Sequence, residues 1–198
     1  MKIPRADIYF RIPRRPLLDT NVAQLLWSFP SLIFERAEND IELTKLARLS
    51  TRMQKDVYAL SHLMALGRRG AFDFVISPRT VRELKLTRGL KAKGLRNWAR
   101  KVMTYSLGVI RGARLTSRLR LLGHRSQVLA ESSMLAFLPD RLDRLLVADA
   151  FCLRADAFLT TDYRTVLRYK TRLKSLGLPA LSPETYSRLW KPLEALYL

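Results

Sequence analysis

The chain has little of what several common classes of protein require. It holds one cysteine, Cys152, so a disulfide framework is excluded and a reducing compartment suits the chain. No apolar run approaches the roughly 18 residues that a membrane-spanning helix needs. Residues 1–5 lack the apolar segment of a signal peptide. We therefore expect a soluble, cytoplasmic protein with no membrane association.

Acidic and histidine residues are also scarce. The 198 residues include 17 Asp and Glu against 36 Lys and Arg, which gives a net charge of +19, and no acid occurs from Leu84 to Ala130. This balance predicts a polyanionic partner, a nucleic acid or an acidic membrane surface, although a generically basic or ribosome-bound protein is the alternative. The two histidines, His62 and His124, are far apart in the chain, so acid–base cleavage of RNA by histidines has little support.

What the chain does contain is enough apolar sequence for one ordinary core. Hydrophobic residues make up 48% of the chain and aromatic residues 9%, which argues against wholesale disorder. We expect a basic N-terminal arm at 1–15 and one domain at 16–198, with a basic helical elaboration at about 85–130.

Short apolar strands alternate with helices along this domain. This alternation predicts an α/β fold with a short parallel sheet flanked by helices on both faces. Thr20 or Asn21 is expected to cap the first helix, and helix breaks are expected near Gly94, between Gly108 and Gly112, and near Gly123. The strands are expected at 16–19, 72–76, 157–159 and 178–181, and the helices at 22–29, at about 40–66, from Ser77-Pro78 onward, at 143–155, after Asp162, and after Ser182-Pro183.

Four acids fall at corresponding places in this pattern. Asp19 and Asp162 end the first and third strands, Glu83 lies on the helix after the second strand, and Asp143 begins the helix that leads into the third. The carboxyl ends of parallel strands meet at one edge of a sheet, where open α/β folds bind ligands. Clustered carboxylates repel unless cations neutralise them, and oxygen ligands suit Mg²⁺ or Mn²⁺. Such ions support in-line phosphodiester hydrolysis.

Each of these acids also has a purely structural explanation. Asp19 suits a turn and Glu83 suits the solvated face of a helix, while Asp143 suits a helix start and Asp162 suits a helix cap. Independent caps, however, have no reason to meet at one edge.

Residues near these acids also have both a functional and a structural interpretation. Thr160 is a candidate to hold a phosphate or a water, or else to cap a helix, and Asn21 is a candidate to orient Asp19, or else a turn residue. Asp140 is the weakest candidate because Pro139-Asp140 fits a helix start, and Asp149 lies on a different helical face from Asp143, outside the site.

The acid-free stretch is the candidate surface for nucleic acid. Basic side chains there would grip an RNA backbone, while Trp98 and Tyr105 would either stack on bases or, as we favour, pack inward. The residues expected to bind RNA are Arg88, Lys91, Arg96, Arg100, Lys101, Arg111, Arg114 and Arg118.

Three segments, in order, resemble the motifs of the PIN-domain nuclease family, including VapC-type toxins. They are Leu17-Leu18-Asp19-Thr20-Asn21-Val22, the segment from Ile76-Ser77-Pro78 to Glu83-Leu84, and the segment from Asp143 to Asp162. The resemblance implies a Rossmann-like PIN fold, dependence on Mg²⁺ or Mn²⁺, and an endoribonuclease that leaves a 5′-phosphate. Carried over residue by residue, it implies Asp19, Glu83, Asp143 and Asp162 as catalytic, metal-binding acids, with Asn21 and Thr160 in support.

The chain departs from the toxins in its length and in its long basic stretch. Small protein-only RNase P enzymes, oligomers that process precursor tRNA, also resemble this plan, but Asn21 stands where they usually have Ser. The function therefore divides between a toxin with an antitoxin partner and an RNA-processing nuclease, acting on tRNA or rRNA as a homo-oligomer. A non-catalytic RNA-binding protein with the same fold and a DNA-directed nuclease stay open as alternatives.

Overall fold

The structure is a computed structural model that describes residues 12–37, 39–68, 72–84, 91–108 and 115–196 of the chain. Most of the predicted N-terminal arm therefore lies outside the described residues. Its last part is attached to the domain: the backbone N–H groups of Arg14 and Arg15 donate to the Asp156 carboxylate at 2.6 and 2.7 Å, and Ile12 is buried.

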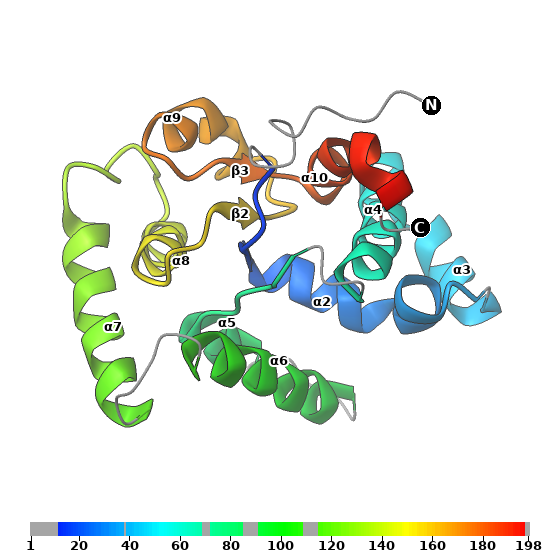
Figure 1. The fold of residues 1–198 in the computed structure, drawn as a ribbon, viewed down its shortest axis with the longest axis horizontal. Coiled ribbons are helices and arrows are strands. Elements are labelled where there is room, and N and C mark those ends of the chain that lie inside the picture. The colour runs from blue at the N-terminus through cyan, green and yellow to red at the C-terminus, as the bar shows by residue number, and fades with distance from the viewer. Residues whose placement is uncertain (1–11, 38, 69–71, 85–90, 109–114, 197–198) are drawn as a thin grey trace.

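A short parallel sheet lies at the centre of the fold (Figure 1). It contains β1 (Pro16–Leu18), β2 (Ala157–Leu159) and β3 (Ala180–Leu181), in that spatial order, with Leu18 opposite Leu159 and Leu159 opposite Leu181. Every residue of β1 and β2 is buried, as expected for a parallel sheet with both faces covered. The predicted α/β class and parallel sheet are confirmed.

The strand predicted at 72–76 is reduced to one parallel bridge between Val75 and Leu17. Val75 N–H donates to the Pro16 carbonyl at 2.9 Å, and the Val75 carbonyl accepts from Leu18 N–H at 2.8 Å. Asp73 adds a bond to the Arg14 carbonyl at 2.8 Å. This segment runs beside β1 on the side away from β2, so β1 is flanked on both sides, which is compatible with a Rossmann-like arrangement.

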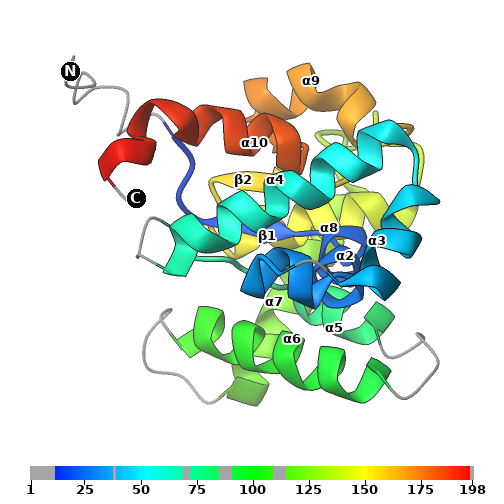
Figure 2. The ribbon, with the colours of Figure 1, turned by 90° about the vertical axis from the view of Figure 1, so that its right-hand side faces the viewer.

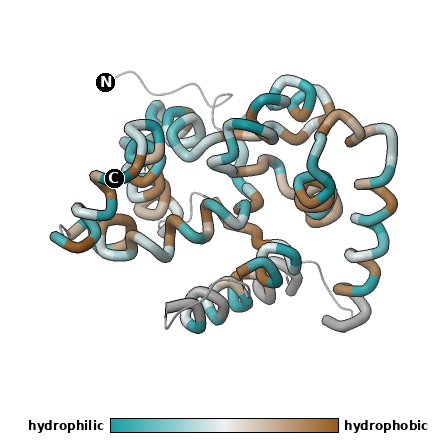
Figure 3. Tube along the Cα trace, turned by 180° about the vertical axis from the view of Figure 1, so that it is seen from behind, coloured by the Kyte–Doolittle hydropathy of each residue, from teal (hydrophilic) through white to brown (hydrophobic). Residues whose placement is uncertain are grey.

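Helices surround this sheet. Figure 1 shows α8 on one side of the strands and α4 with α10 on the other, and Figure 3 shows hydrophilic and hydrophobic residues alternating along the outer helices. The helices are α2 (Thr20–Ser28), α3 (Asp40–Ala47), α4 (Thr51–Arg68), α5 (Pro78–Leu84), α6 (Lys91–Gly108), α7 (Leu115–Glu131), α8 (Arg141–Cys152), α9 (Lys170–Ser175) and α10 (Pro183–Trp190), with a π-helical turn η1 (Ser31–Glu35) and the 3₁₀ turns η2 (Leu167–Tyr169) and η3 (Lys191–Leu196). None of the helices in these described ranges is both long and apolar enough to cross a membrane.

The single helix predicted at about 40–66 is wrong, because the chain breaks between α3 and α4. Ser50 Oγ accepts from Met53 N–H at 3.4 Å, and the Gln54 side-chain amide donates to the Leu49 carbonyl at 3.0 Å. These local bonds offer the backbone an alternative to continuing the helix. Periodicity alone does not reveal such a break.

The final helix packs on its own domain. Tyr186 and Trp190 of α10 are fully buried against Phe72, and the Tyr186 hydroxyl donates to the Pro13 carbonyl at 2.7 Å. His62 of α4 joins this contact, with one ring nitrogen 2.8 Å from Ser187 Oγ and the other 3.0 Å from Glu194 Oε1. The C-terminal helix is therefore an integral part of the core.

The helix breaks predicted near Gly94 and Gly123 are wrong, because Gly94 lies inside α6 and Gly123 lies inside α7. A Cβ at Gly94 would lie 2.5 Å from Cζ2 of Trp27, so the missing side chain lets α6 approach α2. A Cβ at Gly123 would meet nothing within 4 Å. The third predicted break, between Gly108 and Gly112, falls largely outside the described residues.

These two glycines give a matched pair of alanine substitutions. Gly123→Ala should raise the free energy of unfolding by about 1 kcal/mol, because it relieves the helical cost of glycine without a clash. Gly94→Ala should lower it by about 1–3 kcal/mol, because the new methyl group overpacks against the Trp27 ring. Urea denaturation followed by circular dichroism measures both, and shifts in the same direction would contradict the packing described for α6.

Candidate functional site

The carboxyl ends of the strands bring polar residues into one row. Asp19 N–H donates to the Leu159 carbonyl at 3.0 Å, and Thr160 N–H donates to the Leu181 carbonyl at 3.0 Å. Asp19, Thr160 and Ser182 therefore follow β1, β2 and β3 side by side along this edge.

Asp19 is the most buried acid at this edge, with 6% of its surface exposed. Its Oδ1 accepts from Thr20 N–H at 2.6 Å, and its Oδ2 accepts from the Thr160 hydroxyl at 2.6 Å. Asp19 is thus the N-cap of α2, in place of the predicted Thr20 or Asn21. Asn21 is exposed on the first turn, and the bonds that orient Asp19 come from Thr20 and Thr160 rather than from Asn21.

Burial raises the pKa of Asp19 from 3.8 to about 6. The hydrogen bonds from Thr160 and Thr20 oppose this rise, whereas the negative charges of Glu83 and Asp143 add to it. The carboxylate is thus held by two donors but is surrounded by charge of its own sign.

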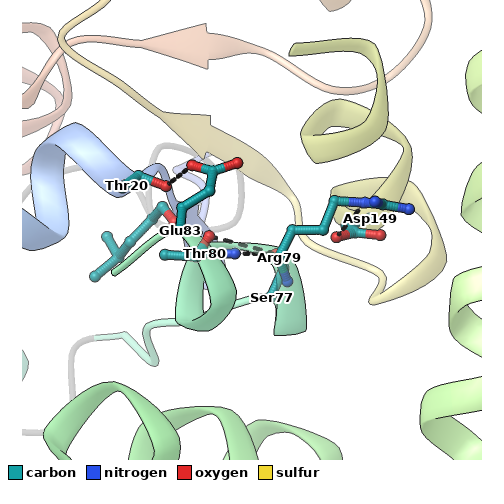
Figure 4. Close-up of polar contacts among 7 residues, drawn as sticks. Thr20, Ser77, Arg79, Thr80, Glu83 and Asp149 are labelled. Atoms are coloured by element: carbon teal, nitrogen blue, oxygen red, sulfur yellow. Dashed lines mark hydrogen bonds and ion pairs between the residues drawn. The ribbon is translucent and has the colours of Figure 1, made fainter. Parts of the chain in front are cut away.

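Glu83 reaches the same edge from α5. The Thr20 hydroxyl donates to Glu83 Oε2 (Figure 4). The helix start predicted at Ser77-Pro78 is confirmed, because Ser77 Oγ accepts from the N–H groups of Arg79 and Thr80, both at 3.1 Å, and so caps α5. Thr80 Oγ1 lies 3.5 Å from the Leu18 carbonyl, which ties α5 to the end of β1.

Asp143 stands in the first turn of α8, which Asp140 caps by accepting from Leu142 N–H at 2.6 Å. The structural reading of Asp140 is thereby confirmed. Burial raises the pKa of Asp143, and the charges of Asp162, Asp140 and Glu83 raise it further, while a hydrogen bond from Thr165 lowers it. The negative charges of the other acids at this edge therefore contribute to the raised pKa of Asp143.

Asp162 is held by the turn that follows it. Its Oδ1 accepts from the N–H groups of Arg164 and Thr165, both at 2.9 Å, and its Oδ2 accepts from the Thr165 hydroxyl. Burial alone would raise the pKa of Asp162, but these bonds outweigh it and leave the pKa below its ordinary value. Asp162 therefore holds the turn at 163–166 and is not the helix cap that the sequence allowed, because η2 and α9 begin later, with Val166 and Tyr169 at their N-cap positions and no side-chain cap.

Thr160 connects the acids of β1 and β2. Its hydroxyl donates to Asp19 Oδ2 and its Oγ1 accepts from Asp162 N–H at 2.9 Å, while its side chain is fully buried. Sequence reasoning missed two further hydroxyls, those of Thr20 and Thr165, which bond Glu83 and Asp162. The Asp-x-x-Thr spacing from Asp162 to Thr165 was the available signal for the second, as a local side-chain-to-backbone turn.

The predicted acids are therefore close enough for their charges to act on one another, Asp19 with Glu83 and Asp143, and Asp143 with Asp162 and Glu83. Within the described ranges, no three His, Cys, Asp or Glu side chains form a ready group of metal ligands. Asp149 stays outside the cluster, as predicted: it is buried and pairs with Arg79, with Nε 3.4 Å from Oδ2 (Figure 4).

The residues expected to bind RNA are only partly described. Arg100 and Lys101 are exposed on α6, while Lys91, Arg96 and Arg118 lie within helices but their side chains are not among those described. Arg88, Arg111 and Arg114 fall outside the described residues altogether. Trp98 packs against the core, as favoured from the sequence.

Comparison with protein-family models, curated proteins and solved structures finds no match to this chain.

The raised pKa of Asp19 predicts a measurable pH dependence of stability. The folded-state pKa of about 6 exceeds the unfolded value of 3.8, so the folded protein binds more protons within this window and its stability falls as pH rises through it. The cost at pH 7 is about 3 kcal/mol. Asp19→Asn should therefore gain stability relative to wild type, by up to this amount, between pH 4 and pH 7.

Urea denaturation of both proteins at the two pH values measures this difference. An unchanged difference between Asp19→Asn and wild type at pH 4 and at pH 7 would contradict the burial of a charged Asp19.

Proposed function

We propose that this chain is a divalent-metal-dependent endoribonuclease with a PIN-type fold. The observation that supports it most is the set of hydroxyl bonds at the carboxyl edge of the sheet: Thr160 bonds both the Asp19 carboxylate and the Asp162 backbone, and Thr20, next to Asp19, bonds Glu83. Asp143 adds its negative charge to this edge. Four acids collected in one place on a chain of net charge +19 call for a positively charged ligand. Each of them belongs to one of the three motifs that resemble the PIN family.

The chemistry of the donor atoms suits Mg²⁺ or Mn²⁺, although no three of the described side chains stand as a ready group of ligands before a cation binds. All of these donor atoms are carboxylate oxygens, which such hard cations prefer, and Asp19 is raised in pKa by burial and by two negative neighbours. Asp19, Asp143 and Asp162 would hold the cation, with Glu83 completing the set. When bound, such an ion activates a water and stabilises the leaving oxygen of a phosphodiester.

The chain's own residues have separable roles in this proposal. Thr160 fixes the orientation of the Asp19 carboxylate and links it to the backbone at Asp162. Thr20 and Thr165 hold Glu83 and Asp162 by their hydroxyls. These hydroxyls keep the acids in place before a ligand arrives, which lowers the cost of organising the site.

The basic residues supply the affinity for RNA. Arg100 and Lys101 on α6, with Arg120 and Arg125 on α7, are exposed and can contact phosphates without reading sequence. A tRNA or rRNA target, an antitoxin partner, a role like that of the small protein-only RNase P enzymes, and a homo-oligomeric state stay predictions from the sequence.

Incubation with total cellular RNA and Mn²⁺, with and without a chelator, tests the proposal. New 5′-phosphate ends should appear only without the chelator. Asp19→Asn should abolish them while RNA affinity, measured by fluorescence anisotropy, stays within about twofold, because phosphate contacts carry the binding. Thr160→Val should slow cleavage by about 10–100-fold, the usual effect of losing a group that orients a metal ligand.

A non-catalytic RNA-binding protein would differ in cleavage and not in RNA affinity. It would bind RNA as wild type does in both variants and would yield no metal-dependent ends in any of them.

A further inference from the structure

A cavity with both polar and apolar side chains in its lining lies at the same edge of the sheet, next to Asp162. It encloses about 260 Å³ and is lined by residues that include Arg52, Tyr163, Arg168, Lys170, Ser182 and Thr185. Figure 2 shows α4, α9 and α10, which supply Arg52, Lys170 and Thr185, on one side of the molecule. Tyr163 directly follows Asp162, and Ser182 follows β3, so the cavity begins one strand beyond Thr160.

The lining is basic. Arg52, Arg168 and Lys170 all contribute exposed side chains to it, and its described lining includes no acid. Arg52 is held in place by stacking on Tyr163, with its guanidinium carbon 4.4 Å from the ring centroid. Cations gathered on one cavity repel each other unless an anion joins them.

A buried acid, Asp56, lies behind Tyr163 and is held by internal bonds, and among the cations named in the lining its charge acts on Arg52. Asp56 has no exposed surface, and its carboxylate accepts from the Tyr163 hydroxyl at 2.8 Å and from Glu184 N–H at 3.1 Å. Asp56 therefore fixes the wall of the cavity from behind. It pins Tyr163, on which Arg52 stacks, to the start of α10.

The start of α10 adds a hydrogen-bond donor to the lining. Ser182 Oγ accepts from Thr185 N–H at 3.1 Å and donates to Thr185 Oγ1 at 3.0 Å. Thr185 Oγ1 accepts that bond and so retains its own proton to donate to a ligand. The N–H groups of Glu184 and Thr185 at this end of α10 are already bonded to Asp56 and Ser182, so a ligand would be held here by side chains.

We propose that this cavity binds a backbone phosphate of a single-stranded RNA, at a nucleotide next to the phosphate that lies on the acids. The volume suits one phosphate with part of its sugar. The position relative to the cleaved bond rests on the proposed nuclease function, whereas phosphate binding by Arg168 and Lys170 does not. The acids and this cavity would then bind successive nucleotides of one RNA strand.

Binding without cleavage tests the cavity separately from the catalytic proposal. In a chelator-containing buffer, the paired variant Arg168→Gln, Lys170→Gln should bind a fluorescent single-stranded RNA about 10-fold more weakly than wild type. The slope of its salt dependence should fall by about 0.7 for each phosphate that the variant no longer neutralises. The matched control, Lys45→Gln with Arg48→Gln, removes the same charge from exposed positions on and beside α3.

Three outcomes separate the explanations. Equal weakening of RNA binding in the two paired variants would overturn the cavity as a specific subsite and leave only general charge attraction. Inorganic phosphate could stabilise wild type but not the Arg168 and Lys170 variant, while the two proteins bind RNA equally well. That result would also overturn the proposal, because the ligand would then be a free anion. Weaker binding confined to the Arg168 and Lys170 variant supports it.

Cleavage with Mn²⁺ then distinguishes the two proposals. With an active enzyme, removal of the two cavity cations should raise KM for RNA with kcat changed less than about threefold, because they bind the strand equally before and during reaction. An inactive wild type that still shows the selective weakening of RNA binding would remove the nuclease proposal and leave the phosphate site standing.

Discussion

The buried carboxylate of Asp19 at the end of β1 is the interaction on which the site depends. Leu17 and Leu18 are fully buried, so the strand delivers Asp19 to an almost solvent-free position. A carboxylate there needs donors, and it receives them from Thr20 at the start of α2 and from Thr160 at the end of β2. Because Thr160 also accepts from Asp162 N–H, the orientation of Asp19 and the path of the chain at Asp162 are set together.

This arrangement separates the two kinds of charge in the chain. The acids gather where the parallel strands end, while basic side chains line the neighbouring cavity and the exposed faces of α6 and α7. A polyanion attracted to the basic surfaces would be repelled from the acids unless a cation lay between them. The proposed metal-dependent reaction on nucleic acid would meet both requirements with one set of residues.

Much of this could be predicted from the sequence, because the signals are local. The apolar runs at 16–18 and 157–159 identify buried strands. The pairs Ser77-Pro78 and Ser182-Pro183 each mark the start of a helix within a few residues. Asp19 and Asp162 follow from their positions after those strands, and Glu83 and Asp143 from their places on the adjoining helices. Asp140 as a cap follows from Pro139 before it.

What could not be predicted depends on contacts between distant segments. Gly94 is read as a break until Trp27 is known to lie against it. The hydroxyl of Thr20 suits a helix cap, and only the position of α5 reveals Glu83 as its partner. The segment at 72–76 has the composition of a strand, but its backbone meets β1 at too few points to extend the ladder.

The most direct test of the account is the place where a divalent cation binds. Substoichiometric Mn²⁺ broadens the NMR signals of nearby amides. The account predicts that the amides of Asp19, Thr20, Thr160 and Asp162 broaden first, and that those around Asp56 and Asp149 stay sharp. Broadening centred on Asp56 or Asp149, or spread evenly over the surface acids, would contradict a metal site at the carboxyl edge of the sheet.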